Sequence, residues 1–179
     1  MKRIFDFVFS LLSLALLFPL IMVLWLTASC NTKMSGFFQQ VRIGQYGKPF
    51  TIYKLRTLNE NGEINIVSFW FRKSKLDELP QLINVLKGDM SFVGPRPDVP
   101  GYYDKLEGEE RNILNLKPGI TSEASIKYRN EETILKQKSN PLKFNDEVIF
   151  PDKVKMNLDY YYNRTFFGDI KIILKTFIK

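Results

Sequence analysis

The chain has 179 residues and a formal net charge of +7, from 26 lysines and arginines against 19 aspartates and glutamates. The length suits one domain with an accessory segment, and the charge favours an acidic partner such as a phosphate, an anionic lipid or a nucleic acid. With no histidine and only one cysteine, Cys30, the sequence excludes an internal disulfide framework, His-ligated metals, and nucleophiles activated by histidine.

An N-terminal segment, residues 1–33, differs from the rest because Ser10 to Ala28 carries no charge. An apolar run of this length can cross a hydrocarbon core of ~30 Å, and it is long for a signal peptide. Pro19 lies inside the run, where it removes a backbone hydrogen bond and kinks a helix. Lys2 and Lys33 flank the run, and such basic residues favour the cytoplasmic side. A re-entrant helix is therefore favoured, with a single span as the alternative and a signal peptide as a third.

A β-hairpin is predicted next, with strands over residues 37–43 and 49–55 and a glycine-containing turn over residues 44–48. Lys54 lies near its end and is a candidate contact for an anionic ligand, although a solvated strand charge is an equal alternative. Residues 64–71 are predicted to be a short apolar connector, whose aromatic residues suit either a core or a membrane surface.

A pair of carboxylates, Asp77 and Glu78, precedes an apolar run with helical spacing. Leucine or isoleucine recurs at i, i+3, i+4 and i+7, at Leu79, Leu82, Ile83 and Leu86. Pro80 is tolerated in a first helical turn and Gly88 ends the helix. The pattern predicts a helix that starts at the pair, where free N–H groups and the preceding Arg72 keep the carboxylates ionised. A charged cap on an ordinary amphipathic helix is the alternative interpretation.

Further along the chain, Arg96 is a candidate phosphate contact because Pro95 and Pro97 stiffen the backbone on both sides of it. An exposed arginine on a structural proline loop is the alternative. Residues 102–116 are predicted to be helical, and a second candidate for anionic ligands, Arg129, lies in the segment that follows.

The C-terminal segment is predicted to be one amphipathic helix that begins at Pro151 and continues to Phe177. Lysines recur in it at four-residue spacing beside an apolar face, at Lys171, Lys175 and Lys179. This pattern is typical of a helix that lies on an anionic membrane, and a helix docked on protein is the equal alternative. The preceding stretch, residues 131–145, is polar.

Five stretches form an ordered set over nearly the whole chain. They are KRIFD (2–6), KPFTIYKLRT (48–57), LDELPQLINVLKGDMS (76–91), VGPRP (93–97) and KPGIT (117–121). Together they resemble motifs of the monotopic phosphoglycosyl transferases of the bacterial sugar transferase family, and residues 76–97 are the most specific part.

The resemblance implies an α+β, mostly helical fold. A proline-kinked re-entrant membrane helix would occupy residues 1–33. A catalytic domain on the cytoplasmic face of the bacterial inner membrane would occupy residues 34–179, with the small hairpin and interfacial amphipathic helices. The implied reaction moves a sugar 1-phosphate from a UDP-sugar to polyprenyl phosphate, typically undecaprenyl phosphate, and releases UMP. Such a step begins glycoconjugate synthesis, as for an exopolysaccharide or a capsule.

By similarity, Asp77 is the nucleophile that forms an aspartyl-phosphosugar intermediate, and Glu78 is its neighbour in an Asp-Glu dyad. Mg²⁺ is the expected metal, held by these two carboxylates. Phosphoryl transfer needs positioning and charge neutralisation. The candidate cations for this purpose are Lys54, Arg72, Arg96 and Arg129.

Two departures from the family pattern stand out. The family often carries a small polar residue before the membrane proline, where this chain has Phe18, so another contact must stabilise the kink at Pro19. The stretch over residues 122–130 also differs, although Arg129 matches the pattern. The identity of the sugar therefore stays open, together with the polyprenyl length, the pathway and whether the protein forms a homo-oligomer.

A non-catalytic membrane adaptor that binds anionic lipids or a partner enzyme is the alternative function. Nucleic-acid binding is disfavoured, because the cations are dispersed and the apolar N-terminus suits a membrane.

Overall fold

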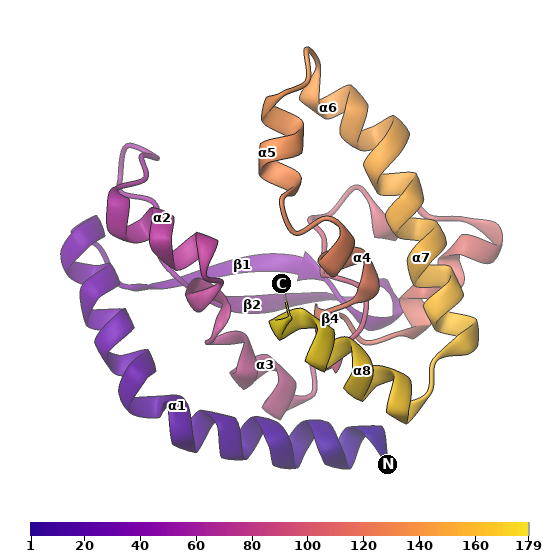
Figure 1. The fold of residues 1–179 in the computed structure, drawn as a ribbon, viewed down its shortest axis with the longest axis horizontal. Coiled ribbons are helices and arrows are strands. Elements are labelled where there is room, and N and C mark those ends of the chain that lie inside the picture. The colour runs from indigo at the N-terminus through magenta and orange to yellow at the C-terminus, as the bar shows by residue number, and fades with distance from the viewer. Residues whose placement is uncertain (179) are drawn as a thin grey trace. The chain divides into compact units, whose positions relative to one another are not determined.

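The computed structural model describes residues 1–178, which are mostly helical with two small two-stranded sheets (Figure 1). The predicted α+β, mostly helical class is therefore confirmed. The chain forms two compact units, one of residues 1–42 and 49–91, and the other of residues 43–48 and 92 onward. The boundary predicted at residue 33 concerns a membrane segment and stays a prediction.

The first unit begins with α1, a helix over Lys2–Thr32 that is long and apolar enough to cross a membrane. It is not the core helix of a soluble protein, because only 17% of its most apolar 18-residue window is buried. Figure 1 shows that α1 bends part-way along its length, and Pro19 lies inside it. A proline within a helix is a common cause of such a bend. Phe18 is 61% exposed, so its ring lies away from the packed side of the helix.

The chain passes from α1 into the hairpin through a close contact at Gly36. Its N–H donates to Ser29 Oγ at 2.8 Å, and a Cβ at this position would lie 2.3 Å from the carbonyl oxygen of Trp25. Strands β1 (Phe37–Ile43) and β2 (Pro49–Leu55) follow, joined by the 3-10 turn Gln45–Gly47. The predicted hairpin is confirmed with its strand boundaries.

The apolar connector predicted over residues 64–71 is wrong, because the structure has a helix, α2, over Ile66–Lys73. The side chain of Asn65 caps it by accepting a hydrogen bond from the Ser68 N–H. Phe71 is buried in a cluster formed with residues of α1 and β2, namely Leu24, Ala28 and Leu55. Its neighbours Phe69 and Trp70 are more than half exposed.

Helix α3 covers Gln81–Lys87, so the predicted start at the carboxylates is wrong. Asp77 and Glu78 lie in the preceding 3-10 turn, Leu76–Glu78, and Pro80 occupies the N-cap position. Gly88 ends the helix with a φ of 93°, as predicted. The predicted apolar stripe is only partly right. α3 contacts both α1 and β2, so its buried residues are Gln81, Leu82, Asn84 and Val85, while Ile83 is 36% exposed.

The second unit contains the short paired strands β3 (Ser91–Val93) and β4 (Gly119–Thr121). Between them lie two 3-10 helices, Tyr103–Lys105 and Gly108–Asn115. The helix predicted over residues 102–116 is therefore wrong, because Gly108 interrupts it with a φ of +53°.

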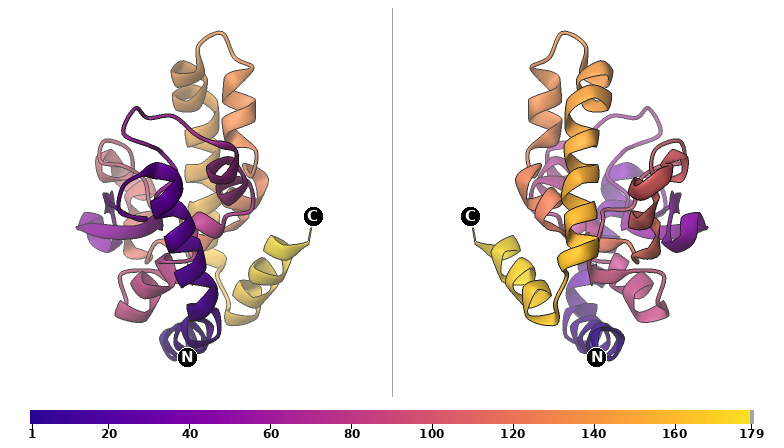
Figure 2. Two further views of the ribbon diagram at one scale, coloured as in Figure 1. Left: turned by 90° about the vertical axis from the view of Figure 1, so that its left-hand side faces the viewer. Right: turned by 90° about the vertical axis from the view of Figure 1, so that its right-hand side faces the viewer.

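Helices form the rest of the second unit, and Figure 2 shows α5 beside a helical run that continues from α6 into α7. Their bounds are α4 Glu123–Lys127, α5 Glu131–Lys136, α6 Pro141–Phe144, a π-helical turn at Asn145–Ile149, α7 Phe150–Asn163 and α8 Phe166–Phe177. The core lies between the 3-10 helices and α7, and it includes Ile43, Tyr103, Ile113 and Val154.

The single C-terminal helix predicted from Pro151 is wrong, because Thr165 starts a new helix by capping the Gly168 N–H. The structure also changes the predicted row of evenly spaced lysines. Lys175 forms an ion pair with Glu123 at 2.7 Å, and Lys179 lies outside the described residues.

Candidate active site

The predicted catalytic carboxylates lie in the 3-10 turn Leu76–Glu78, which we call the carboxylate turn. Lys75 precedes it with a left-handed φ of 60°, which separates the turn from the helical conformation of α2. Asp77 and Glu78 are each only 8% exposed. Burial of a carboxylate is costly unless cations or hydrogen-bond donors offset it, so this turn needs charged neighbours.

Two of the predicted cations belong to elements that contact this turn. Lys54 Nζ lies 3.7 Å from Glu78 Oε1, and its side chain is only 17% exposed. Arg72 lies in the last turn of α2, which packs against the carboxylate turn, as does β2. The structure therefore brings together Lys54 and Glu78, and it places Asp77 and Arg72 on adjoining elements of the same unit.

A buried amide fastens α3 to the hairpin. Asn84 is fully buried, and its Oδ1 accepts the Tyr53 N–H at 3.1 Å while its Nδ2 donates to the Thr51 carbonyl at 2.7 Å. The side chain thus bonds the edge of β2 much as a neighbouring strand would. Nδ2 also donates to Asp89 Oδ2 at 3.2 Å. This clamp sets the helix that follows the carboxylate turn against the strand that carries Lys54.

The other end of α3 is capped from α1. The guanidinium of Arg3 donates to the carbonyls of Val85 at 2.6 Å and Leu86 at 2.8 Å. These carbonyls lie in the last turn of α3, where backbone acceptors lose their usual helical partners, and the Val85 carbonyl also accepts the Gly88 N–H at 3.1 Å. The apolar N-terminal helix is therefore tied directly to the helix that follows the carboxylates.

In the second unit, Arg96 sits in a loop of residues 95–97, which we call the Pro-Arg-Pro loop. The Gly94 N–H donates to the Thr121 carbonyl at 3.0 Å, and the Gly119 N–H donates to the Pro95 carbonyl at 2.8 Å. Gly94 and Gly119 approach so closely that a Cβ on Gly119 would lie 2.1 Å from the Gly94 nitrogen. The glycines of the VGPRP and KPGIT stretches thus permit this backbone crossing.

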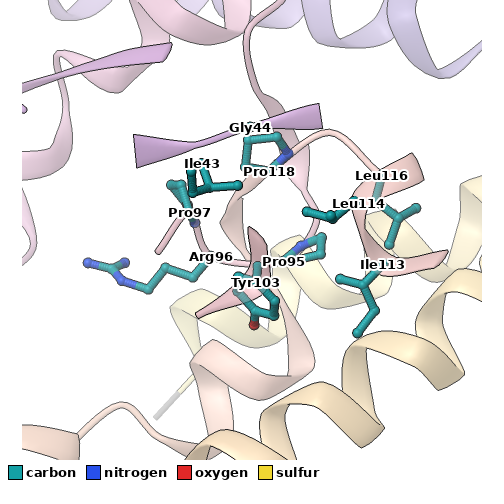
Figure 3. A pocket seen from close by; sticks show the side chains of 10 residues that line it. All are labelled: Ile43, Gly44, Pro95, Arg96, Pro97, Tyr103, Ile113, Leu114, Leu116 and Pro118. Atoms are coloured by element: carbon teal, nitrogen blue, oxygen red, sulfur yellow. The ribbon is translucent and has the colours of Figure 1, made fainter. Parts of the chain in front are cut away.

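The Pro-Arg-Pro loop covers a small apolar cavity of the second unit. In Figure 3 the Arg96 side chain extends away from the group of apolar side chains around the cavity. These are Ile43, Tyr103, Ile113, Leu114, Leu116 and the prolines of the loop and of position 118. The prolines therefore anchor the loop on apolar side chains, and the guanidinium is directed outward.

Arg129 caps a helix in this unit. Its Nη2 donates to the Thr176 carbonyl at 2.7 Å, near the C-terminus of α8. A guanidinium has five donors, so this bond leaves others for an anion. The predicted phosphate-binding roles of Arg96 and Arg129 stay predictions.

The profile of the bacterial sugar transferase family matches residues 1–179. The chain belongs to this family. Together with the relatives described next, this match confirms the prediction that the protein is a phosphoglycosyl transferase enzyme.

Three relatives illustrate the range of this bacterial sugar transferase family. The uncharacterized sugar transferase EpsL of Bacillus subtilis is 33% identical over 98% of this chain and 85% of its own length. The undecaprenyl-phosphate galactose phosphotransferase of Salmonella typhimurium is 31% identical over 98% of this chain, which matches 39% of the longer relative. The UDP-glucose:undecaprenyl-phosphate glucose-1-phosphate transferase of Caulobacter vibrioides is 31% identical, over 98% of this chain and 67% of its own.

Sequence reasoning missed two polar residues of this transferase, Gln81 and Asn84, which are buried on α3. The sequence did contain a signal for them. Both are polar residues among leucines and a valine on a short helix, and a polar side chain on a buried face needs a hydrogen-bond partner. The apolar stripe drew attention to Ile83 instead, which is the exposed residue between them.

Proposed function

We propose that this bacterial sugar transferase moves a sugar 1-phosphate from a UDP-sugar to polyprenyl phosphate and releases UMP. The names of the relatives from Salmonella and Caulobacter support this reaction class. The observation that carries the proposal is the buried carboxylate turn, in which Asp77 adjoins Glu78, and Lys54 of β2 lies 3.7 Å from Glu78.

The proposed chemistry is two successive displacements at one phosphorus. A carboxylate oxygen of Asp77 attacks the phosphorus that bears the sugar, the bond to UMP breaks, and UMP leaves with the electron pair. A phosphate oxygen of polyprenyl phosphate then attacks the same phosphorus, and the bond to Asp77 breaks. The products are polyprenyl-diphosphate sugar and the original carboxylate, so the kinetics are ping-pong.

The neighbours of Asp77 prepare it for this role. Burial keeps bulk water from the acyl-phosphate, which would otherwise be hydrolysed before the lipid phosphate arrives. Lys54 offsets the negative charge of Glu78, and Arg72 adds positive charge from an element that packs on the turn. A phosphate ligand adds negative charge to the same place, so these cations favour its binding.

Mg²⁺ fits the donor chemistry of this turn. No group of three or more His, Cys, Asp or Glu side chains able to hold a metal occurs within residues 1–178. Mg²⁺ is commonly bound by one or two carboxylates together with substrate phosphates, which matches the Asp77–Glu78 pair. When bound, the ion would supply neutralisation of the diphosphate charge.

We further propose that α1 enters and leaves the membrane on the cytoplasmic side of the bacterial inner membrane. Its exposed side chains are mostly apolar, including Leu12, Leu16 and Val23 at 60% exposure or more. The bend and the flanking Lys2 and Lys33 favour both ends on one side. This arrangement would hold the carboxylate turn near the phosphate of a membrane lipid.

The topology is tested with cysteines placed at Lys2 or Lys33 in a Cys30→Ser background, because Cys30 itself is exposed. In spheroplasts, a membrane-impermeant thiol reagent should label neither position, and both should react once the membrane is opened. Labelling of one position in intact spheroplasts would show a full span instead.

The activity is tested by measuring UMP release from UDP-sugars with polyprenyl phosphate and Mg²⁺. Asp77→Asn should lower the rate at least about a thousandfold, because loss of a covalent nucleophile removes both displacements. Glu60→Gln, which changes an exposed acid of the same unit, serves as the control and should keep full activity. Activity in Asp77→Asn would contradict the nucleophile assignment, and absence of UMP release by the wild type would favour the adaptor alternative.

A further inference from the structure

Gln81 is a buried amide whose N–H donor finds no acceptor in the described part of the chain. Its side chain is 2% exposed, and Nε2 makes no hydrogen bond within residues 1–178. A buried N–H that loses water without gaining a partner destabilises the folded state, so most proteins avoid it. A residue of this kind suggests an acceptor that arrives with a ligand.

The backbone places Gln81 beside the carboxylates. Leu79 and Pro80 have helical φ and ψ angles, so the carboxylate turn continues into α3 without a reversal. Residues three and four apart share one side of such a segment, and Gln81 follows Glu78 by three and Asp77 by four. The three side chains are all buried, at 8%, 8% and 2% exposure. The unsatisfied Nε2–H of Gln81 therefore lies in the same part of the first unit as the proposed nucleophile, Asp77.

Asn84, a second buried amide on α3, has a structural role and so provides a comparison for Gln81. Asn84 uses its oxygen and its nitrogen on Tyr53, Thr51 and Asp89. It thereby fastens α3 to β2. Gln81 is as deeply buried, yet its nitrogen makes no such bond, so its N–H has no structural role of the kind that Asn84 shows.

We propose that Gln81 is a substrate-binding residue whose Nε2–H donates to a non-bridging phosphoryl oxygen of the nucleotide-sugar diphosphate. The inference rests on the proposed function, because it takes the ligand from that reaction. A neutral donor suits a site beside a nucleophilic carboxylate. A lysine or arginine here would pair with Asp77 and hold its oxygen away from phosphorus, whereas an amide binds the phosphate and leaves the carboxylate charge in place.

The decisive comparison is between Gln81→Met and Asn84→Leu in the full-length protein in detergent. Methionine has a similar length and shape but no N–H, so Gln81→Met removes an unsatisfied donor. Its Tm should equal or exceed that of the wild type, while kcat/KM for UMP release falls at least tenfold. Asn84→Leu leaves Tyr53 and Thr51 without partners and should lower Tm. A Tm of Gln81→Met that falls as far as that of Asn84→Leu would overturn the proposal, because the amide would then be structural.

A second variant and a binding measurement keep the test independent of catalysis. Gln81→Glu places an acceptor against the phosphate oxygens, so it should reduce kcat/KM more than Gln81→Met does. A UDP-sugar should raise the Tm of the wild type, and this shift should shrink in Gln81→Met. An unchanged shift, or wild-type kcat/KM in either Gln81 variant, would refute the role of Gln81.

The two proposals fail in different ways. If the wild type binds a UDP-sugar but releases no UMP, the proposed reaction is wrong, and the Tm shift alone decides the role of Gln81. If the wild type releases UMP and Gln81→Met matches it, the reaction stands and the inference about Gln81 fails.

Discussion

The carboxylate turn and the Pro-Arg-Pro loop both present charged side chains, but different contacts hold them. The carboxylate turn is stabilised by side chains: Lys54 lies against Glu78, and Asn84 fastens the following helix to β2. The Pro-Arg-Pro loop is stabilised by backbone: Gly94 and Gly119 donate across the crossing and leave no space for a Cβ on either residue.

This difference predicts how each region responds to mutation. A backbone crossing fails when one atom is added, because neighbouring main chain cannot move aside. A region stabilised by side chains loses stability gradually, because each partner that is removed lowers the unfolding free energy by its own amount.

The largest effect is expected from Gly119→Ala. Its Cβ would lie 2.1 Å from the Gly94 nitrogen, so the β3–β4 crossing must open, at a cost of about 3–5 kcal/mol in unfolding free energy. Gly108→Ala is the matched control, since Gly108 also belongs to the second unit and a Cβ there meets nothing within 4 Å. Its left-handed φ of +53° limits the loss to about 1–2 kcal/mol. Similar urea midpoints for the two variants would show that the crossing is not tight.

An intermediate effect is expected from Lys54→Met. It leaves Glu78 buried without the lysine that lies 3.7 Å away, which should cost about 1–3 kcal/mol and lower the rate of UMP release. Lys54→Arg restores the charge and should recover most of the stability. Lys48→Met changes an exposed lysine of the same hairpin and should leave Tm unchanged. Equal Tm values for Lys54→Met and Lys48→Met would mean that the Lys54 contact does not hold the turn.

The smallest effect is expected from Asp152→Asn, and it depends on pH. Hydrogen bonds from Lys127 and Tyr128 to Asp152, each 2.7 Å, lower the pKa of its carboxyl below the ordinary value of 3.8. A lowered folded-state pKa stabilises the protein above the unfolded value, and this contribution is lost as pH falls through the folded one. The Tm of the wild type should therefore exceed that of Asp152→Asn at pH 7, and the gap should close below about pH 4. A gap that stays constant down to pH 3 would contradict the ion pair.

The hairpin and the end of α3 were predictable because local rules decide them. Strand alternation and the glycine-containing turn gave the bounds 37–43 and 49–55, and Gly88 adopts the left-handed conformation that ends a helix. The family motifs likewise identified Asp77 and Glu78 as a pair, and both are buried in one turn.

The wrong helix boundaries arose where a pattern of apolar residues continues across a residue that begins or ends a helix. The C-terminal pattern of apolar residues continues across Thr165, although that residue caps a new helix through its hydroxyl. Asn65 gave the same kind of signal before α2, and the aromatic run after it obscured the signal. The hydrogen bonds of Asn84 join residues more than 30 positions apart, and the burial of Gln81 is set by tertiary packing, so periodicity alone reveals neither.

Trapping of the covalent intermediate tests the central claim most directly. The purified protein is incubated with a UDP-sugar and Mg²⁺ without polyprenyl phosphate, then digested and analysed by mass spectrometry. We expect a sugar-phosphate adduct on Asp77, formed with one equivalent of UMP and discharged when polyprenyl phosphate is added. UMP release that requires polyprenyl phosphate from the first turnover, with no adduct on Asp77, would show direct transfer and contradict the account.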